Sequence, residues 1–413
     1  MAKWLRALGI AVAVPGLVLA QTAISVENTG SVERPLSEGQ VLPEVHSVHT
    51  ILWTDDGGSD ESYNVYVSDA PITDVAAANV FRVGTEIAEG QQAFEYALLT
   101  PFSPGAVANY YAVTLVSSGG VENATVAAGT NATTGATDGT TDWAQPIFWF
   151  IDAPFIDGDF SDWPFAPVDM DPDNPDNFFG GEITGPSDFT YSAAMGIDAD
   201  NLYVRAEATD DLFVNTAETG TGDIWQGDAA EWYVGTYHLG PSDSRHAGTQ
   251  YGSEGSPEAA QPDLQVVVAA NAFDDGERTH LFGPANADGL NGTLGSFGAE
   301  IQTIETATGW AIEASVSLEG IAQDPAIILP YQPKIGHILP TTFAGNDGDD
   351  PAGGRQGQLF WSKDESVNNA WNTPSSWQRE QVIYDPKVFG LGGGGTTAVK
   401  SSSWGEIKAG AIR

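Results

Sequence analysis

The chain has 413 residues, with 56 Asp and Glu against 15 Lys and Arg, which gives a formal net charge of −41. Nucleic-acid phosphates repel a polyanion of this size, so the composition excludes nucleic acid as a partner. The lack of Cys excludes a disulfide framework, a thiolate metal site and a Cys nucleophile, and the 48 Gly favour a turn-rich β protein of two or three domains.

Residues 1–20 have the layout of a cleaved secretory signal peptide. Lys3 and Arg6 form a basic start, the apolar run Ala7–Leu19 follows, and the mature chain is expected to begin at Gln21. The apolar run is too short for a comfortable membrane span, and no later stretch reaches spanning length. The sequence therefore predicts an exported bacterial protein without a membrane span, either secreted or at the cell surface. An uncleaved anchor is the alternative.

Residues 21–117 are predicted to form a small β-sandwich, because short strand-like segments alternate with turns. These segments are Thr50–Trp53, Tyr63–Val67 and Asn109–Val116. The early Trp, the Tyr-x-Val-Tyr segment and the late Tyr-Tyr-Ala-Val-Thr segment resemble the fibronectin type III family, whose domains are spacers or interaction modules. We expect Trp53, Tyr66 and Tyr111 to be core residues of this domain.

Residues 118–146 are rich in Gly, Ala, Thr and Asn, a composition typical of connecting segments. We predict a linker here, or an irregular last strand followed by a linker. Residues 147–386 are predicted to form one larger sandwich or jelly roll. Its strand-like segments are Leu202–Ala208, Ala230–Val234, Leu264–Val268 and Trp310–Val316. Helical periodicity is nearly absent, apart from a turn at Leu318–Ala322, so the predicted fold class is all-β with two β-sandwich domains.

Aromatic residues beside polar ones mark the candidate binding segments of the second domain. A sugar ring has apolar C–H faces and a belt of hydroxyls, so its site needs an aromatic platform next to planar polar groups. Ile224–Tyr233 and Phe360–Pro374 have this composition.

Five segments, in this order, resemble the family 9 carbohydrate-binding modules. They are Ile156-Asp157-Gly158 with Trp163, Asp198–Val204, Trp225-x-x-Asp228-x-x-Glu231, Gly309–Ala314, and Trp361-Ser362 with Asn368-Asn369-Ala370-Trp371. The resemblance covers roughly Ile156 to Tyr384. It implies a β-sandwich that binds a polysaccharide or an oligosaccharide.

The resemblance also implies the site residues. In that family two Trp rings hold a terminal sugar between them, and Trp225 and Trp371 match their positions. Glu231 and Asn368 match residues that form hydrogen bonds with the sugar hydroxyls. Gln265 stands where the family has a binding Arg, and Gln lacks the charged fork of Arg. From the residues alone, Trp225 could instead be a core residue at the rim, and Glu231 could be solvated. Four further Trp are expected in the core: Trp163, Trp310, Trp361 and Trp377.

Calcium is the predicted metal, with Asp169, Asp171 and Asp173 as ligands. Closely spaced carboxylates with turn residues can supply the oxygen ligands that this hard cation takes. Residues 346–350 are a second acidic stretch, and the family resemblance also implies structural calcium. The alternative is that such clusters arise without an ion in a chain with 56 acidic residues. We expect Asp228 to orient its loop.

The predicted function is therefore non-catalytic carbohydrate binding. The chain has no nucleophile elbow, phosphate loop or nucleotide-binding glycine pattern. Two alternatives stay open: a structural or surface-assembly protein, and a polysaccharide-active enzyme. Residues 387–413 combine a Gly-rich spacer with a basic tail, which is a candidate for self-association or surface docking.

Overall fold

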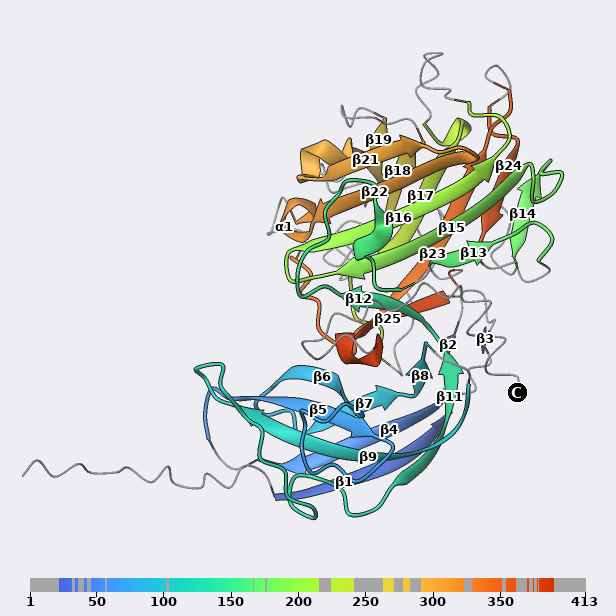
Figure 1. Cartoon of the computed structure of the whole chain (residues 1–413). Helices are drawn as coiled ribbons and strands as arrows, with labels where there is room; N and C mark the ends of the chain where they lie inside the picture. Colours follow the sequence, from blue (N-terminus) through green and yellow to red (C-terminus); the bar gives the residue numbers. More distant parts are fainter. Residues whose placement is uncertain are drawn as a thin grey trace, which may run out of the picture.

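The computed structural model has two lobes built from strands (Figure 1). It describes residues 22–31, 34–35, 41–42, 46–55, 58–101, 104–165, 167–174, 177–214, 224–240, 263–270, 278–282, 291–322, 329–350, 354–361, 370, 374, 377 and 379–389. The predicted signal peptide and the tail beyond Phe389 lie outside these residues. None of the described helices has the length and apolar composition needed to cross a membrane. The all-β fold class is confirmed.

The first lobe is a sandwich of two antiparallel sheets. One sheet has the order β1-β4-β7, formed by β1 (Thr22–Ser31), β4 (Ser47–Thr54) and β7 (Ala93–Ala97). The other has the order β6-β5-β9-β11-β8, formed by β5 (Ser62–Ser68), β6 (Val80–Ala88), β8 (Leu99–Thr100), β9 (Gly105–Val116) and β11 (Thr137–Trp143), with β10 (Glu122–Asn123) pairing β9 and β8 joining in parallel. The short β2 (Arg34–Pro35) and β3 (Val41–Leu42) pair separately. The expected core residues Trp53, Tyr66 and Tyr111 are all buried.

The segment predicted as a linker, or as an irregular last strand followed by a linker, contains paired strands. β11 pairs with β9 along five residues, from Thr137 opposite Asn109 to Thr141 opposite Gly105. Its last residues then pair in parallel with β8. Only Ala144 separates β11 from the first strand of the second lobe, so the two lobes are joined by a continuous extended chain.

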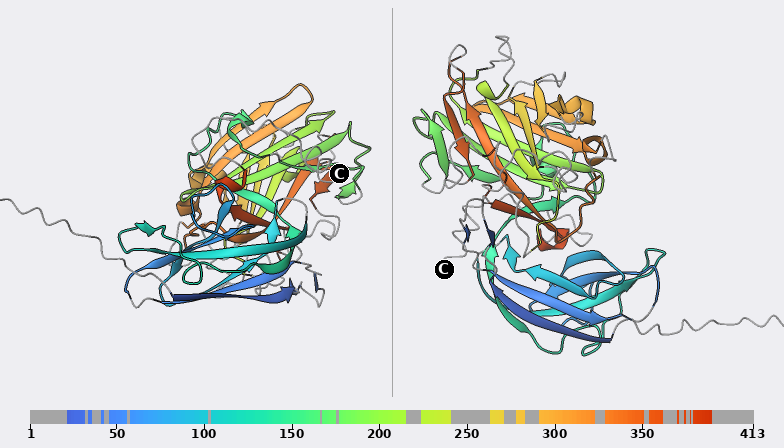
Figure 2. Two further views of the ribbon diagram at one scale, coloured as in Figure 1. Left: turned by 60° about the horizontal axis from the view of Figure 1, so that its bottom comes forward. Right: turned by 180° about the vertical axis from the view of Figure 1, so that it is seen from behind.

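The second lobe is one hydrogen-bonded sheet of fourteen described strands that curls into two layers (Figure 2). Its main path is β20-β19-β18-β17-β23-β25-β12-β15-β16-β22-β21, with β13, β14 and β24 at its side. The strands are β12 (Gln145–Trp149), β13 (Val168–Met170), β14 (Phe178–Gly181), β15 (Phe189–Ile197), β16 (Asn201–Asp210), β17 (Ala229–Gly235), β18 (Asp263–Ala269), β19 (Thr279–Phe282), β20 (Asn291–Gly292), β21 (Glu300–Glu305), β22 (Gly309–Ser317), β23 (Ile338–Asp347), β24 (Gly357–Phe360) and β25 (Arg379–Tyr384).

Helical structure is limited to single turns. The described turns are η2 (Phe160–Asp162), η4 (Ile224–Gln226), η7 (Leu294–Phe297), η9 (Pro386–Phe389) and α1 (Leu318–Ile321). α1 lies where the sequence predicts its one helical turn, and Ser317 caps it by accepting a hydrogen bond from Gly320 N.

The core of the second lobe lies between the two layers. Side chains at every second position of β15, β16, β17, β22 and β23 point into it, including Trp232, Trp310 and Phe343. The four Trp residues predicted to be core, Trp163, Trp310, Trp361 and Trp377, are at most 6% exposed.

Three of the five family-like segments meet at one corner of this lobe, away from β17. Glu313 on β22 is buried, and its Oε2 accepts hydrogen bonds from the backbone N–H groups of Asp157 (3.1 Å) and Gly158 (2.9 Å). Its Oε1 accepts from Trp163 Nε1 (2.6 Å). Tyr203 on β16 belongs to the same buried apolar cluster as Trp163, and Ile156 packs against that cluster. These contacts give the three segments a structural role.

The two lobes contact each other through apolar and charged groups. The apolar cluster at the contact joins Ala97 and Leu99 of the first lobe to Ala144, Tyr237, Leu239, Ile338, Val382 and Tyr384. Lys334 Nζ donates a hydrogen bond to the backbone oxygen of Glu86 (3.0 Å), and Arg82 lies 3.8 Å from Asp385. Gly336 packs directly on the backbone of Val83 in β6.

Candidate functional site

Strands β17 and β18 each bury one face in the core and turn the other toward a polar cluster. Ala230, Trp232 and Val234 point into the core, so the alternation places Glu231 and Tyr233 on the opposite face of β17. Gln265 of β18 pairs with Tyr233 across the sheet. The period of two residues thus brings the predicted site residues Glu231 and Gln265 to one face.

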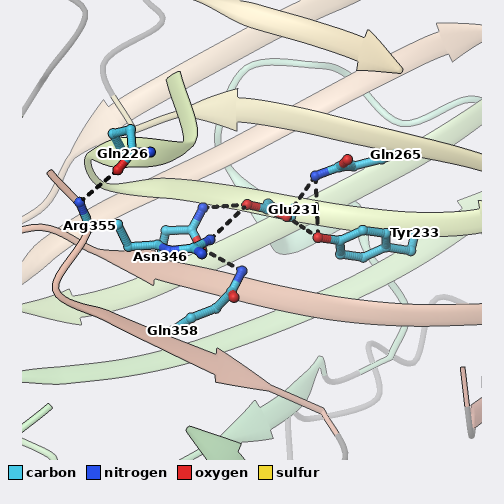
Figure 3. Close-up of polar contacts among 7 residues, drawn as sticks. All are labelled: Gln226, Glu231, Tyr233, Gln265, Asn346, Arg355 and Gln358. Carbon is cyan, nitrogen blue, oxygen red and sulfur yellow. Dashed lines mark hydrogen bonds and ion pairs between the residues drawn. The ribbon is translucent and has the colours of Figure 1, made fainter. Parts of the chain in front are cut away.

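The carboxylate of Glu231 is the centre of this cluster (Figure 3). Its Oε2 accepts hydrogen bonds from the hydroxyl of Tyr233 and from Gln265 Nε2, the latter at 2.9 Å. Its Oε1 accepts from Asn346 Nδ2 (2.5 Å). Glu231 is only 1% exposed. The interpretation of Glu231 as a solvated surface residue is therefore wrong, because protein donors and not bulk water satisfy the carboxylate.

A guanidinium and two amides complete the cluster. Arg355 Nη1 lies 3.7 Å from Glu231 Oε1 and donates a hydrogen bond to Asn346 Oδ1 (3.1 Å). Gln358 Nε2 donates to the same Asn346 oxygen (2.8 Å). Gln226, next to Trp225, accepts a hydrogen bond from the backbone N–H of Arg355 (3.3 Å). Residues from η4, β17, β18, β23 and β24 therefore form one polar network (Figure 3).

An apolar wall borders the polar cluster on the same face. Its buried members are Tyr233, Ala344, Phe360, Ala370 and Trp377. The rings of Tyr233 and Trp377 have centres 5.9 Å apart, and Trp377 Nε1 donates to the backbone oxygen of Ala370 (2.8 Å). The face thus combines aromatic groups with planar hydrogen-bonding groups, which is the composition that a sugar site needs.

Of the two Trp residues predicted to hold the sugar, the structure describes only Trp225. Trp225 lies in η4 and is partly buried against an apolar cluster of Ile224, Ala229, Val267 and Ala269. Trp225 is thus half-buried and retains some accessible surface. Trp371 and Asn368 lie outside the described residues.

Five members of the network were not predicted as site residues, and one of them is Gln226, which contacts the backbone of Arg355. The other four, Tyr233, Asn346, Arg355 and Gln358, contact Glu231 directly or through Asn346. Asn346 belongs to the acidic stretch 346–350, which the sequence suggested as a second set of calcium ligands because it is rich in carboxylates. The alternation of β23 was a usable signal for Asn346. Asn346 stands two residues after Ala344, so both side chains lie on the same face of the strand.

Buried carboxylates gather on the other side of the same strands, between the two layers. Carboxylate oxygens of Asp210, Asp228 and Asp347 lie within 4.8 Å of one another, and all three residues are buried. Burial and the neighbouring carboxylates Asp349 and Asp210 raise the pKa of Asp347 to about 7. Burial and the charge of Asp210 raise the pKa of Asp228 as well. We call these three residues the inner carboxylate cluster.

The prediction that Asp228 orients its loop agrees with its hydrogen bonds. Its carboxylate accepts from the backbone N–H of Val214 (2.5 Å) and from that of Gly348 (2.9 Å). A second group of carboxylates, Asp188, Asp211 and Asp349, also lies within 4.8 Å. The charge of Asp349 raises the pKa of Asp347, so the two groups are close enough to interact.

The three carboxylates predicted as calcium ligands do not converge. Asp169 is exposed on β13, and Asp171 Oδ1 accepts a hydrogen bond from the backbone N–H of Asp173 (2.8 Å). Asp169 and Asp171 line a cavity of about 450 Å³ on the outer face of β13, β15 and β16, together with Thr190, Ser192 and Glu207. Among the described residues, the groups of three carboxylates close enough to share an ion are those named above.

Solved structures of other proteins are similar to part of this chain. Two solved structures of a family 9 carbohydrate-binding module from Caldicellulosiruptor kristjanssonii, in complex with glucose and with cellotriose, are each 18% identical to this chain. They cover 58% and 63% of it and 95% and 100% of their own chains, with TM-scores of 0.38 and 0.40. A putative carbohydrate-binding protein from Bacteroides uniformis is 10% identical, over 50% of this chain and 85% of its own, with a TM-score of 0.29.

A search of curated protein sequences finds no match. The sequence profile of the family described as carbohydrate family 9 binding domain-like, however, matches residues 174–381, which is just over half of the chain. This region contains β17, β18, β23 and β24, the strands that carry the polar cluster. The chain therefore belongs to the carbohydrate family 9 binding domain-like family.

Proposed function

We propose that this is an exported, non-catalytic protein that binds carbohydrate at the polar cluster around Glu231. The observation that carries the proposal is the single buried carboxylate held by amide, hydroxyl and guanidinium groups on one sheet face. Sugar hydroxyls both donate and accept hydrogen bonds, so a carboxylate flanked by donors matches them. Membership of the family supports the same ligand class.

The sugar ring itself needs a flat apolar surface, and Trp225 supplies one side of it. Trp225 lies three residues before Asp228 and borders Gln226, which contacts the backbone of Arg355. In the proposal, Trp371 covers the other face of the ring and Asn368 adds a hydrogen bond. A bound hydroxyl then takes the place of one protein donor at Glu231, which keeps the carboxylate satisfied.

Arg355 offers the positive charge that Gln265 lacks. Its guanidinium approaches Glu231 from the turn before β24, whereas Gln265 approaches from β18. We restrict the proposed ligand class to neutral oligosaccharides and polysaccharides, because the amide, hydroxyl and guanidinium groups of the cluster match hydroxyl groups as hydrogen-bonding partners.

The test is calorimetric titration of the chain from Gln21 onward with soluble β-glucan, xylan, and cello- and xylo-oligosaccharides. Trp371→Ala is expected to abolish binding, and Glu231→Gln to weaken it at least about tenfold, because hydrogen bonds to a charged group contribute about 1.5–3 kcal/mol. Phe155→Ala, an aromatic residue that is 77% exposed, is the matched control and should bind as the wild type does.

Two outcomes would redirect the proposal. The absence of heat with every glycan, from a protein whose circular dichroism shows a folded β structure, would favour surface assembly instead. The release of new reducing ends from a polysaccharide would contradict the non-catalytic role and favour the alternative of a polysaccharide-active enzyme.

A further inference from the structure

The polar network around Glu231 has a buried centre and an accessible rim. Glu231, Asn346 and Gln358 are at most 4% exposed. Gln226, by contrast, is half-buried, and the side chain of Arg355 is 19% exposed. A ligand that arrives from solvent therefore meets Gln226 and Arg355 before it meets the carboxylate.

Gln226 and the aromatic platform come from the same turn, η4, and flank Glu231. Trp225 packs against the apolar cluster that contains Val267 of β18, the residue that pairs with Glu231 across the sheet. Gln226 reaches instead toward the turn before β24, where it contacts the backbone of Arg355 (Figure 3). η4 thus places an aromatic ring on the β18 side of Glu231 and an amide on the side of β24.

The contact with Arg355 fixes which way the amide of Gln226 points. The backbone N–H of Arg355 lies 3.3 Å from Gln226 Oε1. Because a backbone N–H only donates, the amide atom that faces it must be the carbonyl oxygen. The NH₂ group of Gln226 then lies on the other side of the amide. Nε2 has no hydrogen-bond partner in the part of the chain that the structure describes.

Close packing against two glycines restricts the amide further. Gly354 has a φ of +75°, and a Cβ there would lie 2.7 Å from Gln226 Oε1. A Cβ on Gly348 would lie 3.0 Å from the Cα of Gly227. Only glycine lets η4 and the turn before β24 approach this closely. The carbonyl of Gln226 therefore stays against the turn, and its NH₂ group stays directed away from it.

We propose that Gln226 is a sugar-binding residue, whose Nε2 donates a hydrogen bond to a hydroxyl of the ring that stacks on Trp225. This inference rests on the proposed function and adds a contact residue to it. Sugar hydroxyls accept as well as donate hydrogen bonds, so a fixed amide donor beside an aromatic ring matches a hydroxyl at the edge of the sugar. Since the amide is oriented before the ligand arrives, binding does not have to immobilise it.

The first experiment tests the orientation of the amide without a sugar, by nuclear magnetic resonance of the isotope-labelled chain from Gln21 onward. Gln226→Met should move the backbone N–H resonance of Arg355 upfield, because the N–H loses its acceptor. Gln226→Glu should keep it downfield, because Glu retains an acceptor oxygen at that place. Gln91→Met, at an exposed position of the first lobe, is the matched control. An unmoved Arg355 resonance in Gln226→Met would overturn the proposed orientation.

The second experiment tests the sugar contact by calorimetric titration with cellotriose and its monodeoxy derivatives. A more tightly bound oligosaccharide from the first titration takes their place if there is one. Gln226→Met should weaken binding about fivefold, the effect of losing one neutral hydrogen bond. One monodeoxy derivative should bind the wild type about fivefold more weakly than cellotriose does, and Gln226→Met should bind the two equally. Arg355→Ala keeps the backbone N–H, so it should still discriminate against that derivative.

Gly354→Ala disturbs the same contact from the opposite side. Its Cβ would displace the carbonyl of Gln226, so it should weaken cellotriose binding about as much as Gln226→Met does. Gly120→Ala is the matched control, since Gly120 has a φ of +74° and open space around its Cβ position in the first lobe. It carries the same backbone strain and should bind cellotriose as the wild type does.

The outcomes separate the contact from the proposed function. Unchanged affinity in Gln226→Met, or a Gln226→Met protein that discriminates against every monodeoxy derivative as the wild type does, would overturn the sugar contact and leave the binding function standing. No binding of any glycan by the wild type, together with the expected shift of the Arg355 resonance, would refute the proposed function and the sugar contact with it. The orientation of the amide would then stand alone.

Discussion

Glu231 receives its hydrogen-bond donors from distant parts of the chain. Tyr233 of β17 and Gln265 of β18 are neighbours across the sheet. Asn346 comes from β23, and Arg355 comes from the turn that follows it. The guanidinium of Arg355 is 3.7 Å from the carboxylate and has a side chain that is 19% exposed. Arg355 is thus the charged member of the network with the best access to a ligand.

The first prediction is that a guanidinium beside Glu231 can come either from position 355 or from position 265. Arg355→Ala should weaken oligosaccharide binding about tenfold, because it removes a charged donor next to Glu231. The double variant Arg355→Ala with Gln265→Arg should recover most of that loss, since it places a guanidinium on β18 beside the same carboxylate. Calorimetric titration with the best glycan ligand measures both effects.

The control for this exchange is Lys334→Ala, which removes a cation at the contact between the lobes, away from the polar cluster. It should not change sugar affinity. Equal affinity of Arg355→Ala and the wild type would show that Arg355 serves only to hold Asn346, and a double variant as weak as the single one would contradict the exchange of roles.

At the residue scale, the family resemblance implied Glu231 and Gln265, and the alternation of β17 and β18 places both on one face. Neither predicted Arg355, whose position depends on the turn between β23 and β24 and on Gln226 from a remote segment. The carboxylates are a similar case. Asp169, Asp171 and Asp173 are dense in the sequence but spread in space, whereas Asp210, Asp228 and Asp347 are separate in the sequence and converge only when the layers pack.

Among the elements, the regular strands were predictable and the irregular ones were not. The segments Leu202–Ala208, Ala230–Val234 and Trp310–Val316 all lie within observed strands, because their apolar residues recur at every second position. β11 (Thr137–Trp143) has the composition of a linker. It becomes a strand because β9 and β8 supply its hydrogen-bond partners, which local sequence does not encode.

The entry into β23 contains a pair of stacked imidazoles that predicts a pH dependence. The rings of His238 and His337 have centres 4.6 Å apart, and His337 Nδ1 is 3.0 Å from the hydroxyl of Tyr331. Burial, together with the nearby His238 and Lys334, lowers the pKa of His337 to about 3. Folding therefore keeps this imidazole neutral at pH values where the unfolded chain would protonate it.

The second prediction follows from this difference. Because the folded pKa of His337 lies below the unfolded value of about 6.5, the unfolded state binds more protons, and stability is lost as the pH falls from about 6.5 toward about 3. His337 should cost about 2 kcal/mol of the free energy of unfolding between pH 6.5 and pH 5. Urea denaturation of the wild type and of His337→Gln at both pH values measures this cost.

The comparison with His337→Gln isolates the imidazole from other titrating groups. The buried carboxylates, whose pKa values are raised, favour the folded state at low pH and are present in both proteins. The variant should therefore lose about 2 kcal/mol less than the wild type on acidification. Parallel pH dependences of the two proteins would assign the acid sensitivity to other residues.

On the scale of the whole molecule, the first lobe packs against the second next to two strands of its sheet, β12 and β23. β11 and β12 are separated by Ala144 alone, and Ala144 belongs to the apolar cluster that joins the lobes. Gly336 lies at the same contact, and His337 follows it directly before β23, the strand that carries Asn346 and Asp347. A disturbance of the contact thus starts next to the strand that connects the polar cluster to the inner carboxylates.

The last prediction tests whether this contact joins the lobes into one cooperative unit. Gly336 has a φ of +89° and donates a hydrogen bond from its N–H to Ile383 O (2.7 Å). A Cβ on Gly336 would lie 1.7 Å from the backbone oxygen of Val83 in β6. Because backbone atoms cannot rotate away as a side chain can, Gly336→Ala should force the lobes apart and lower the free energy of unfolding by at least about 2 kcal/mol.

Gly90→Ala is the matched control, since Gly90 has a φ of +87° and open space around its Cβ position. It carries the same backbone strain, about 1 kcal/mol, without the collision. In differential scanning calorimetry, Gly336→Ala should split one unfolding transition into two, and small-angle scattering should show a larger radius of gyration, whereas Gly90→Ala should keep one transition and the wild-type radius. If the two variants behave alike, the lobes are held by the chain connection at Ala144 and not by the contact at Gly336.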